Sequence, residues 1–170
     1  MRLIRLGKRG LPTMKARQKG FSLIELLIVV AIILIIAAIA IPNLLRSRMA
    51  ANEASAVGSL RTVNTAAIAY STEYPATGYP ASLAVLKPVA AGTGATSATA
   101  DLVDVVLSGG TKSGYSFTFT SDGKTPSLTY SNTAQPVTPG SSGQRYFFTN
   151  QSGVIRGNAT AAATVADLPL

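Results

Sequence analysis

The apolar positions of the chain form three patterns, and the first is a long run near the N-terminus. Residues 21–41 read FSLIELLIVVAIILIIAAIAI, in which only Ser22 and Glu25 are polar. At about 1.5 Å per residue such a helix spans roughly 31 Å, which matches the hydrocarbon core of a bilayer. The run therefore predicts a membrane-spanning helix. Pro42 follows it directly and can kink the helix or mark its edge.

Beyond Pro42 the apolar positions continue at helical spacing, but on one face only. At about 100° per residue they fall within one stripe. We therefore expect the helix to continue to about Ser71. Its one-sided half can cover a sheet, whereas the first half has nothing of its own chain to bury it. The stripe consists of Leu45, Met49, Ala56, Leu60, Val63, Ala67 and Tyr70.

The third pattern is the alternation of apolar and polar residues that is typical of half-buried strands. Tyr115, Phe117 and Phe119 alternate with serine and threonine. The Asp-Gly pair in residues 121–124 predicts a tight hairpin turn, and the polar residues 132–143 are expected to form a loop. The predicted antiparallel strands are 115–120, a returning strand that contains Leu128 and Tyr130, 145–149 and 154–156.

Turn-forming residues gather between the helix and the strands and beyond. Residues 73–170 hold 11 of the 15 glycines and seven of the nine prolines. Both residue types favour turns and loops. Between the helix and the strands we expect one helical turn at residues 82–86, a loop at 90–100 and a short helix at 101–107, for which a strand is the alternative.

The charge of the chain is concentrated in its first twenty residues. The protein has 170 residues and a formal net charge of +8, and residues 1–20 contribute +7 through seven basic side chains and no acid. A basic segment ahead of an apolar helix sets membrane topology, because Lys and Arg stay on the cytoplasmic side. The near-neutral remainder does not suggest nucleic-acid binding. Arg46 and Arg48, just behind the run, are expected to be solvated anchors at the membrane interface.

Missing residue types exclude several kinds of chemistry. The sequence contains no Cys and no His, which excludes disulfides, thiolate or imidazole metal sites and His-dependent triads. Ser121-x-x-Lys124 has the spacing of a serine acyl enzyme but straddles a predicted turn. The glycosylation sequons at Asn150 and Asn158 are interpreted as coincidental. We therefore expect no catalytic residue, no cofactor and no metal, and no enzyme activity.

A secretory signal peptide is the alternative interpretation of the basic and apolar N-terminus. Ala38-Ile39-Ala40 would supply its cleavage site, and cleavage after Ala40 would release a secreted binding or enzymatic domain. The length of the run and the presence of Glu25 argue against it, because an acid within an apolar helix is costly and usually has a role.

Residues 20–30 read GFSLIELLIVV and closely resemble the cleavage and methylation motif of type IV prepilins and type II secretion pseudopilins. The resemblance implies that a prepilin peptidase cuts between Gly20 and Phe21 and N-methylates Phe21. It also implies that Glu25 acts in assembly and methylation, and that Pro42 kinks the helix.

A physical argument supports an assembly role for Glu25. An unpaired carboxylate buried in an apolar medium costs several kcal/mol. Two helices offset along a fibre could pair Glu25 of one copy with the N-terminal ammonium of another, which would neutralise both charges and favour one register. The alternative is that Glu25 merely lies at the membrane interface.

The resemblance and the three patterns together predict an α+β fold of the type IV pilin kind, with a long N-terminal helix packed on a small antiparallel sheet of about four strands. The expected segments are a basic leader peptide (1–20), the transmembrane and assembly half of the helix (21–42), its amphipathic half (43–72), a loop region (73–113), the antiparallel sheet (114–156) and a C-terminal tail (157–170).

The implied function is that of a structural subunit of a type IV pilus or pilin-like filament. The implied partners are other copies of the chain, the prepilin peptidase, an inner-membrane platform protein with its cytoplasmic ATPase, and membrane lipid. Before assembly the subunit would cross the inner membrane once with its N-terminus in the cytoplasm. It would then become part of a periplasmic or extracellular filament.

A pseudopilin of a type II secretion system remains an alternative. Major pseudopilins commonly hold calcium through C-terminal acids, and a calcium site needs several oxygen ligands. Here the tail has one acid, Asp167, which weakens this alternative. Asp101, Asp104 and Asp122 could still come together in space.

The start of the chain is a separate question. Met14 opens MKARQKG, a short basic leader like those usual in this family. We therefore expect translation to begin at Met14. Mass spectrometry of unprocessed protein from peptidase-deficient cells would test this, and a peptide that contains Leu11 or Thr13 would contradict it.

Overall fold

The computed structural model describes residues 20–170, and the chain divides into two compact units, Met1–Ala40 and Ile41–Leu170. Residues 1–19 of the expected leader, with the start at Met14 among them, lie outside the described residues. The helices are α1 (Leu23–Glu73), the 3₁₀ turn η1 (Leu83–Leu86) and α2 (Val105–Ser108). The strands are β1 (Thr111–Lys112), β2 (Tyr115–Ser121), β3 (Tyr130–Pro136), β4 (Tyr146–Asn150) and β5 (Arg156–Asn158).

Helix α1 is continuous through Pro42, as the two helical patterns predict. A proline inside a helix removes one backbone donor, which a helix of 51 residues tolerates at a single position. The helix ends where Tyr74 precedes Pro75, because the residue before a proline is disfavoured in helical conformation. The N–H of Tyr74 still donates to the carbonyl of Tyr70 at 2.8 Å.

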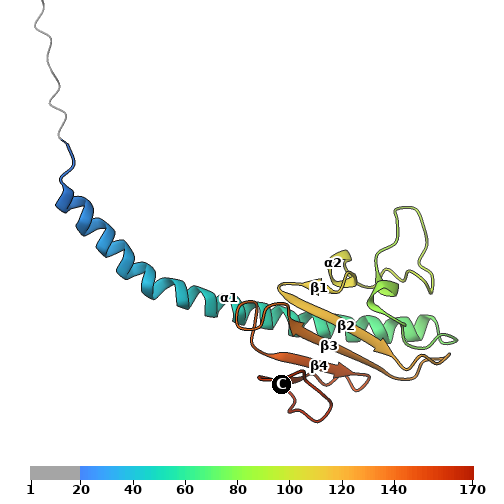
Figure 1. Cartoon of the computed structure of the whole chain (residues 1–170). Helices are drawn as coiled ribbons and strands as arrows, with labels where there is room; N and C mark the ends of the chain where they lie inside the picture. The colour runs from blue at the N-terminus through green and yellow to red at the C-terminus, as the bar shows by residue number, and fades with distance from the viewer. Residues whose placement is uncertain (1–19) are drawn as a thin grey trace, which may run out of the picture. The chain divides into compact units, whose positions relative to one another are not determined.

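The five strands form one antiparallel sheet in chain order (Figure 1). Strands β2 and β3 pair over their full length, from Tyr115 opposite Pro136 to Ser121 opposite Tyr130. A meander of this kind has one face on the core and can leave the other in solvent. The predicted α+β fold with a long N-terminal helix on an antiparallel sheet is confirmed, with five strands in place of about four.

The loop predicted at residues 132–143 is wrong in its first part, which belongs to strand β3. Residues 132–143 are predicted to be a loop, but β3 runs from Tyr130 to Pro136. Two of its inward-facing positions hold Asn132 and Ala134. Because neither is a large apolar residue, the strand shows no alternation in the sequence. The two-residue strand β1 is likewise too short to leave a pattern.

The connection between β2 and β3 is wider than the predicted tight hairpin. Ser121 opposite Tyr130 is the last strand pair, so residues 122–129 form a loop. The carboxylate of Asp122 accepts the N–H of Leu128 at 3.2 Å and thereby closes this loop. Leu128, predicted to be on the returning strand, lies in the loop and is 69% exposed.

The remaining elements lie close to their predicted positions. The turn predicted at residues 82–86 is confirmed as η1. Helix α2 is shorter than the predicted helix 101–107, because Asp104 ends the loop and caps the helix. Its carboxylate accepts the N–H groups of Val106 and Leu107 at 3.0 and 2.9 Å. Strand β5 begins two residues later than predicted.

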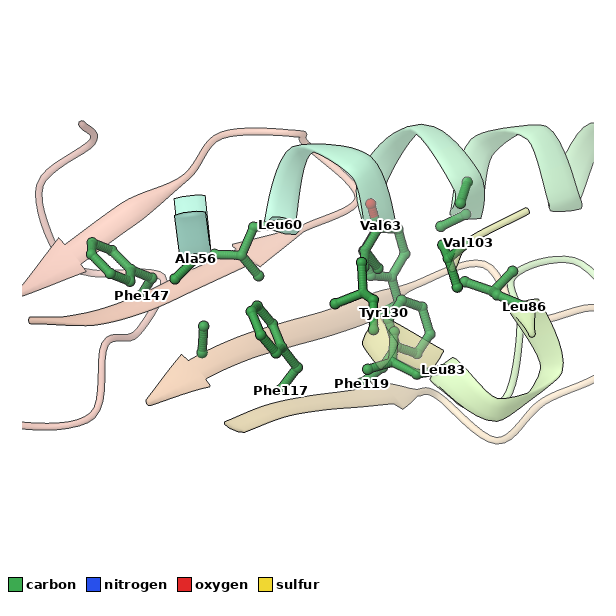
Figure 2. Close-up of a cluster of buried hydrophobic side chains, with 14 of the residues drawn as sticks. Ala56, Leu60, Val63, Leu83, Leu86, Val103, Phe117, Phe119, Tyr130 and Phe147 are labelled. Carbon is green, nitrogen blue, oxygen red and sulfur yellow. The ribbon is translucent and has the colours of Figure 1, made fainter. Parts of the chain in front are cut away.

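The amphipathic half of α1 covers the inner face of the sheet (Figure 2). Leu60 and Val63 of the helix lie over Phe117, Phe119 and Tyr130 of the sheet, and all five side chains are buried. Burial of one such large apolar side chain contributes about 1.5–3 kcal/mol. The predicted stripe is therefore confirmed in its second part.

The stripe begins later than predicted. Leu45 is 48% exposed, and Met49 is only half-buried. The first helix residues that hold the sheet region are polar. Asn52 donates from Nδ2 to the carbonyl of Ser142 at 2.8 Å. The carboxylate of Glu53 accepts the backbone N–H of Gln144, two residues after Ser142.

The last residues of the chain run along the outer edge of β5. The N–H of Gly157 donates to the carbonyl of Leu168 at 3.2 Å, and the N–H of Leu170 donates to the carbonyl of Ile155 at 3.0 Å. These bonds satisfy backbone groups that an edge strand would otherwise leave open.

Candidate assembly site

The apolar half of α1 is exposed along its length. Within residues 20–170, α1 is the one helix that is long and apolar enough to cross a membrane. Its most apolar 18-residue window has a mean hydropathy of 3.3, and none of that window is buried. Leu23, Leu34 and Ile39 are 79%, 63% and 66% exposed. An apolar surface of this size needs an apolar partner, which can be lipid or another protein.

Gly20 and Phe21 lie directly ahead of α1 and outside it. Phe21 is 79% exposed, and an added Cβ at Gly20 would meet no atom within 4 Å. The peptide bond between them is therefore accessible without unwinding the helix.

Glu25 makes a contact at the start of α1 that was not predicted. The N–H of Ser22 donates to Oε2 of Glu25 at 2.8 Å. The carboxylate thereby satisfies one of the open backbone donors at the helix N-terminus and lies at the positive end of the helix dipole. The spacing of Ser22 and Glu25 is that of a capping box, and this spacing in the sequence could have revealed the contact.

Pro42 does not join these residues. It lies inside α1, 17 residues after Glu25 (42 − 25), and is exposed. Arg46 and Arg48 follow it and are exposed as well. The structure thus brings Gly20, Phe21 and Glu25 to the start of the helix.

A second group of polar contacts, also missed from the sequence, ties α1 to the loop before β4. Oε1 of Glu53 accepts the N–H of Gln144 at 2.9 Å and the N–H of Arg145 at 3.2 Å. Glu53 is half-buried beside a hollow of about 260 Å³ between the helix and Gln144. A single acid at the edge of the apolar stripe, four residues after Met49, gave no pattern to detect.

Asn64 forms a buried polar bridge between α1 and the sheet. Its Nδ2 donates to Oγ1 of Thr149 at 2.8 Å, and its Oδ1 accepts the hydroxyl of Tyr130 at 3.1 Å. Burial raises the pKa of Tyr130 to about 12, so the hydroxyl remains protonated and can donate. All three side chains are buried, which makes each of these bonds important.

Acidic side chains of the head (the unit Ile41–Leu170) stabilise loops by accepting hydrogen bonds. The pKa of Asp104 is lowered mainly by the backbone N–H of Leu107, which donates to its carboxylate. The pKa of Asp122 is lowered mainly by the nearby side chain of Ser127 and by the N–H of Lys124. Asp104 also forms an ion pair with Lys112 at 2.9 Å. Among residues 20–170, no three acidic side chains gather in a group that could hold a metal ion. Asp101, Asp104 and Asp122 are therefore not brought together.

The tail beyond β5 is organised by Asp167. Its Oδ2 accepts the N–H of Thr164 at 2.6 Å, and its Oδ1 accepts Nδ2 of Asn158 at 2.8 Å. The N–H of Thr164 is the main cause that lowers the pKa of Asp167. Both oxygens of this carboxylate therefore accept hydrogen bonds within the tail, and they fix the loop between Asn158 and Asp167.

The N-terminal region matches known proteins. The sequence model of the family described as "Prokaryotic N-terminal methylation motif" matches residues 15–41. The chain is 69% identical over 35 residues to the type IV wide pilus major component PilA4 of Thermus thermophilus, which is 21% of this chain and 27% of that protein. It is 46% identical over 57 residues to the type IV major pilin protein PilA of Myxococcus xanthus, which is 34% of this chain and 26% of that protein.

These matches confirm the resemblance of residues 20–30 to prepilins. The chain spans about a quarter of the length of the curated relatives it matches. No solved structure matches the chain. The chain thus carries a prepilin-type methylation motif ahead of an α+β head, an architecture consistent with a pilin fold.

Proposed function

We propose that the chain is a structural subunit of a type IV pilus or a pilin-like filament and assembles through residues 21–42. The observation that carries this proposal is a prokaryotic methylation motif on a helix whose apolar half is exposed on all sides. Both relatives are named as major components of type IV pili, which favours a pilus over a type II secretion pseudopilus.

Maturation would begin at the exposed bond ahead of α1. A prepilin peptidase would cut between Gly20 and Phe21 and methylate the new amino group of Phe21. The inner membrane would hold the subunit until assembly, with residues 43–170 on the outer side. Because Lys and Arg flanks stay in the cytoplasm, the basic leader supports this orientation.

Assembly would move the apolar half-helix from lipid into a bundle of its copies. Lipid is as apolar as the inside of such a bundle, so the transfer itself gains little hydrophobic free energy. The work must come from outside the subunit, and the family draws it from a membrane platform protein and a cytoplasmic ATPase. The subunit itself supplies close packing and a register.

Glu25 is proposed to set that register. Cleavage creates an ammonium at Phe21, and an offset neighbour can place its own ammonium beside the carboxylate of Glu25. In the described chain this carboxylate accepts the N–H of Ser22. The neighbour's ammonium therefore competes with a neutral donor of the same helix, and a charged donor makes the stronger hydrogen bond.

The test of the proposed function is the N-terminus of the mature protein. Edman sequencing or mass spectrometry of protein from the native cell should find N-methyl-Phe21. A start at Ile41 would instead indicate a signal peptide cut after Ala40 and a released domain. That result would refute the proposal.

Deletion of the gene separates a pilus from a secretion filament. Loss of surface fibres in negative-stain microscopy is the expected result. Loss of secreted enzymes with unchanged fibres would assign the chain to a type II secretion system.

A further inference from the structure

A second hollow, the outer-sheet hollow, lies on the face of the sheet that points away from the core. Strands β2, β3 and β4 lie side by side there (Figure 1). The hollow has a volume of about 420 Å³, and its lining comes from the ends of these strands and from the tail. That volume is within the usual range of small-molecule sites. All of the lining residues belong to the head.

Three polar side chains form a row across the hollow. Thr120 of β2 is opposite Ser131 of β3, and Ser131 is opposite Asn150 of β4. Neighbouring strands are about 4.8 Å apart and paired residues share a face, so the row spans roughly 10 Å. The adjacent residues Phe119 and Asn132 are buried on the inner face, which places the row on the outer face.

The polar groups of this row can bind a ligand. Among residues 20–170 the hydroxyls of Thr120 and Ser131 make no hydrogen bond, and neither does the side-chain amide of Gln151 beside them. Oδ1 of Asn150 accepts the N–H and the hydroxyl of Ser152 at 3.0 and 2.7 Å. These two bonds fix the amide of Asn150 and leave its Nδ2 as a donor.

Asp122 supplies a fixed, charged acceptor at the rim. Its Oδ1 accepts the N–H of Lys124 at 3.1 Å, and its Oδ2 accepts the N–H of Leu128 at 3.2 Å. A carboxylate has about four acceptor sites, so about two of them stay open to a ligand. Two neighbouring hydroxyls of one molecule can donate to them, and hydrogen bonds to a charged acceptor are the stronger kind.

Phe148 is the exception on this face. The other outward side chains of β2, β3 and β4 carry a hydroxyl or an amide. Phe148 lies two residues before Asn150, so its ring is on the same face as the row, and it is only partly buried. Val165 of the tail, which is 60% exposed, adds a second apolar contact. A ligand that fits here has an apolar face and a polar edge.

We propose that the outer-sheet hollow binds a neutral glycan. A pyranose ring has C–H groups on its faces and hydroxyls around its edge. It can therefore lie against Phe148 while its hydroxyls form hydrogen bonds with the row and with Asp122. Backbone contacts already hold Asp122 and Asn150, which lowers the entropic cost of binding. The inference goes beyond the proposed function and does not rest on it.

Other classes of ligand fit this lining less well. None of the lining residues is basic, so a phosphate, sulfate or carboxylate group would face the charge of Asp122 without a counter-charge. This disfavours nucleic acids, which are bound through basic side chains, and acidic glycans. An added peptide strand needs an open sheet edge, whereas the row crosses β3, which is an inner strand.

The experiment titrates the full, isotope-labelled chain with three neutral hexasaccharides: maltohexaose, cellohexaose and chitohexaose. Micelles of dodecylphosphocholine keep the chain in solution, because this detergent has no sugar headgroup. The amide NMR signals of Thr120, Ser131 and Gln151 report binding. We expect at least one of the three probes to shift these signals saturably. Hexagalacturonate, which is negatively charged, should leave them unchanged.

Two variants test the contacts with the glycan. Thr120→Val removes one hydroxyl and should lower the affinity about fivefold, the effect of one hydrogen bond. Phe148→Leu keeps an apolar side chain but loses the ring face, and should also lower the affinity about fivefold. The matched control is Thr118→Val, which makes the same change on the outer face of β2 but outside the hollow. It should leave the affinity within about twofold of the unmodified chain.

Three results would overturn the inference. The first is the absence of a saturable shift with any of the three neutral hexasaccharides at millimolar concentration. The second is stronger binding of hexagalacturonate than of the neutral probes. The third is an equal loss of affinity in Thr120→Val and Thr118→Val, which would place the bound sugar elsewhere on the sheet.

Discussion

Two buried asparagines, Asn64 and Asn132, offer a matched test of how the head is held together. Asn64 bridges the helix to the hydroxyls of Tyr130 and Thr149. Asn132 lies on the inner face of β3 with 0% exposure, and neither of its side-chain amide atoms has a hydrogen-bond partner. Removal of the two amides should therefore have opposite effects on stability.

Asn64→Ala leaves two buried hydroxyls, those of Tyr130 and Thr149, without their partner. Each orphaned group costs about 1–3 kcal/mol. Alanine regains roughly half a kcal/mol through its higher helix propensity. The free energy of unfolding should fall by about 1.5–5.5 kcal/mol, which lowers Tm by roughly 6–22 °C at about 4 °C per kcal/mol in a domain of this size.

Asn132→Val removes an amide that is shielded from water and has no hydrogen bond to offset the loss of hydration. Valine is of similar size and favours strands. The free energy of unfolding should rise by about 1–3 kcal/mol, the desolvation penalty of an unsatisfied polar group. Tm should rise accordingly.

The assay is thermal unfolding of the full chain in detergent micelles, followed by near-UV circular dichroism of the buried tyrosines. The unmodified chain and both variants are measured together. If Asn132→Val lowers Tm as much as Asn64→Ala does, the amide of Asn132 has a partner, such as a buried water, and the reasoning is wrong.

The remaining predictions concern the core, the tail and the helix start. Leu60→Ala should lower the free energy of unfolding by about 2–5 kcal/mol in denaturant titrations, whereas an effect below 1 kcal/mol would mean that the helix does not pack on the sheet as described. The pKa of Asp167 is lowered in the folded state, so its stabilisation is present above about pH 4 and is lost as the pH falls through the folded value. Asp167→Asn should therefore flatten the dependence of Tm on pH below about pH 4, and an unchanged slope would exclude this role. Glu25→Ala and Glu25→Gln should both leave the head folded and fail to enter filaments beside unmodified subunits, as scored by immunogold microscopy. Normal incorporation of Glu25→Gln, which still accepts the N–H of Ser22, would assign Glu25 to helix capping alone.

The helix and most of the sheet could be predicted because their patterns are strong. An apolar run followed by a stripe of apolar residues on one face is compatible with few structures other than one long helix. The alternation at Tyr115, Phe117 and Phe119 defines β2. A returning strand was predicted, but its course beyond Tyr130 was not, because the inner face of β3 is built from Asn132 and Ala134 and shows no apolar alternation there.

The candidate site was only partly predictable. The motif drew attention to Gly20 and Phe21, which lie directly ahead of α1, and to Glu25 in its first turn. Glu53 was missed because a lone acid on a helix is usually solvated, and its two backbone partners lie about 90 residues further along the chain. Contacts between distant segments depend on the fold and leave no trace in local spacing.

The segment that runs along β5 has a consequence for a crowded array of subunits. Identical sheets held at high density invite strand-to-strand zippering between neighbours, which is difficult to reverse. With Leu168 and Leu170 bonded to the chain at Gly157 and Ile155, this border offers few vacant main-chain groups. In the proposed filament, neighbouring heads would therefore touch through side chains, and such contacts can form and separate repeatedly.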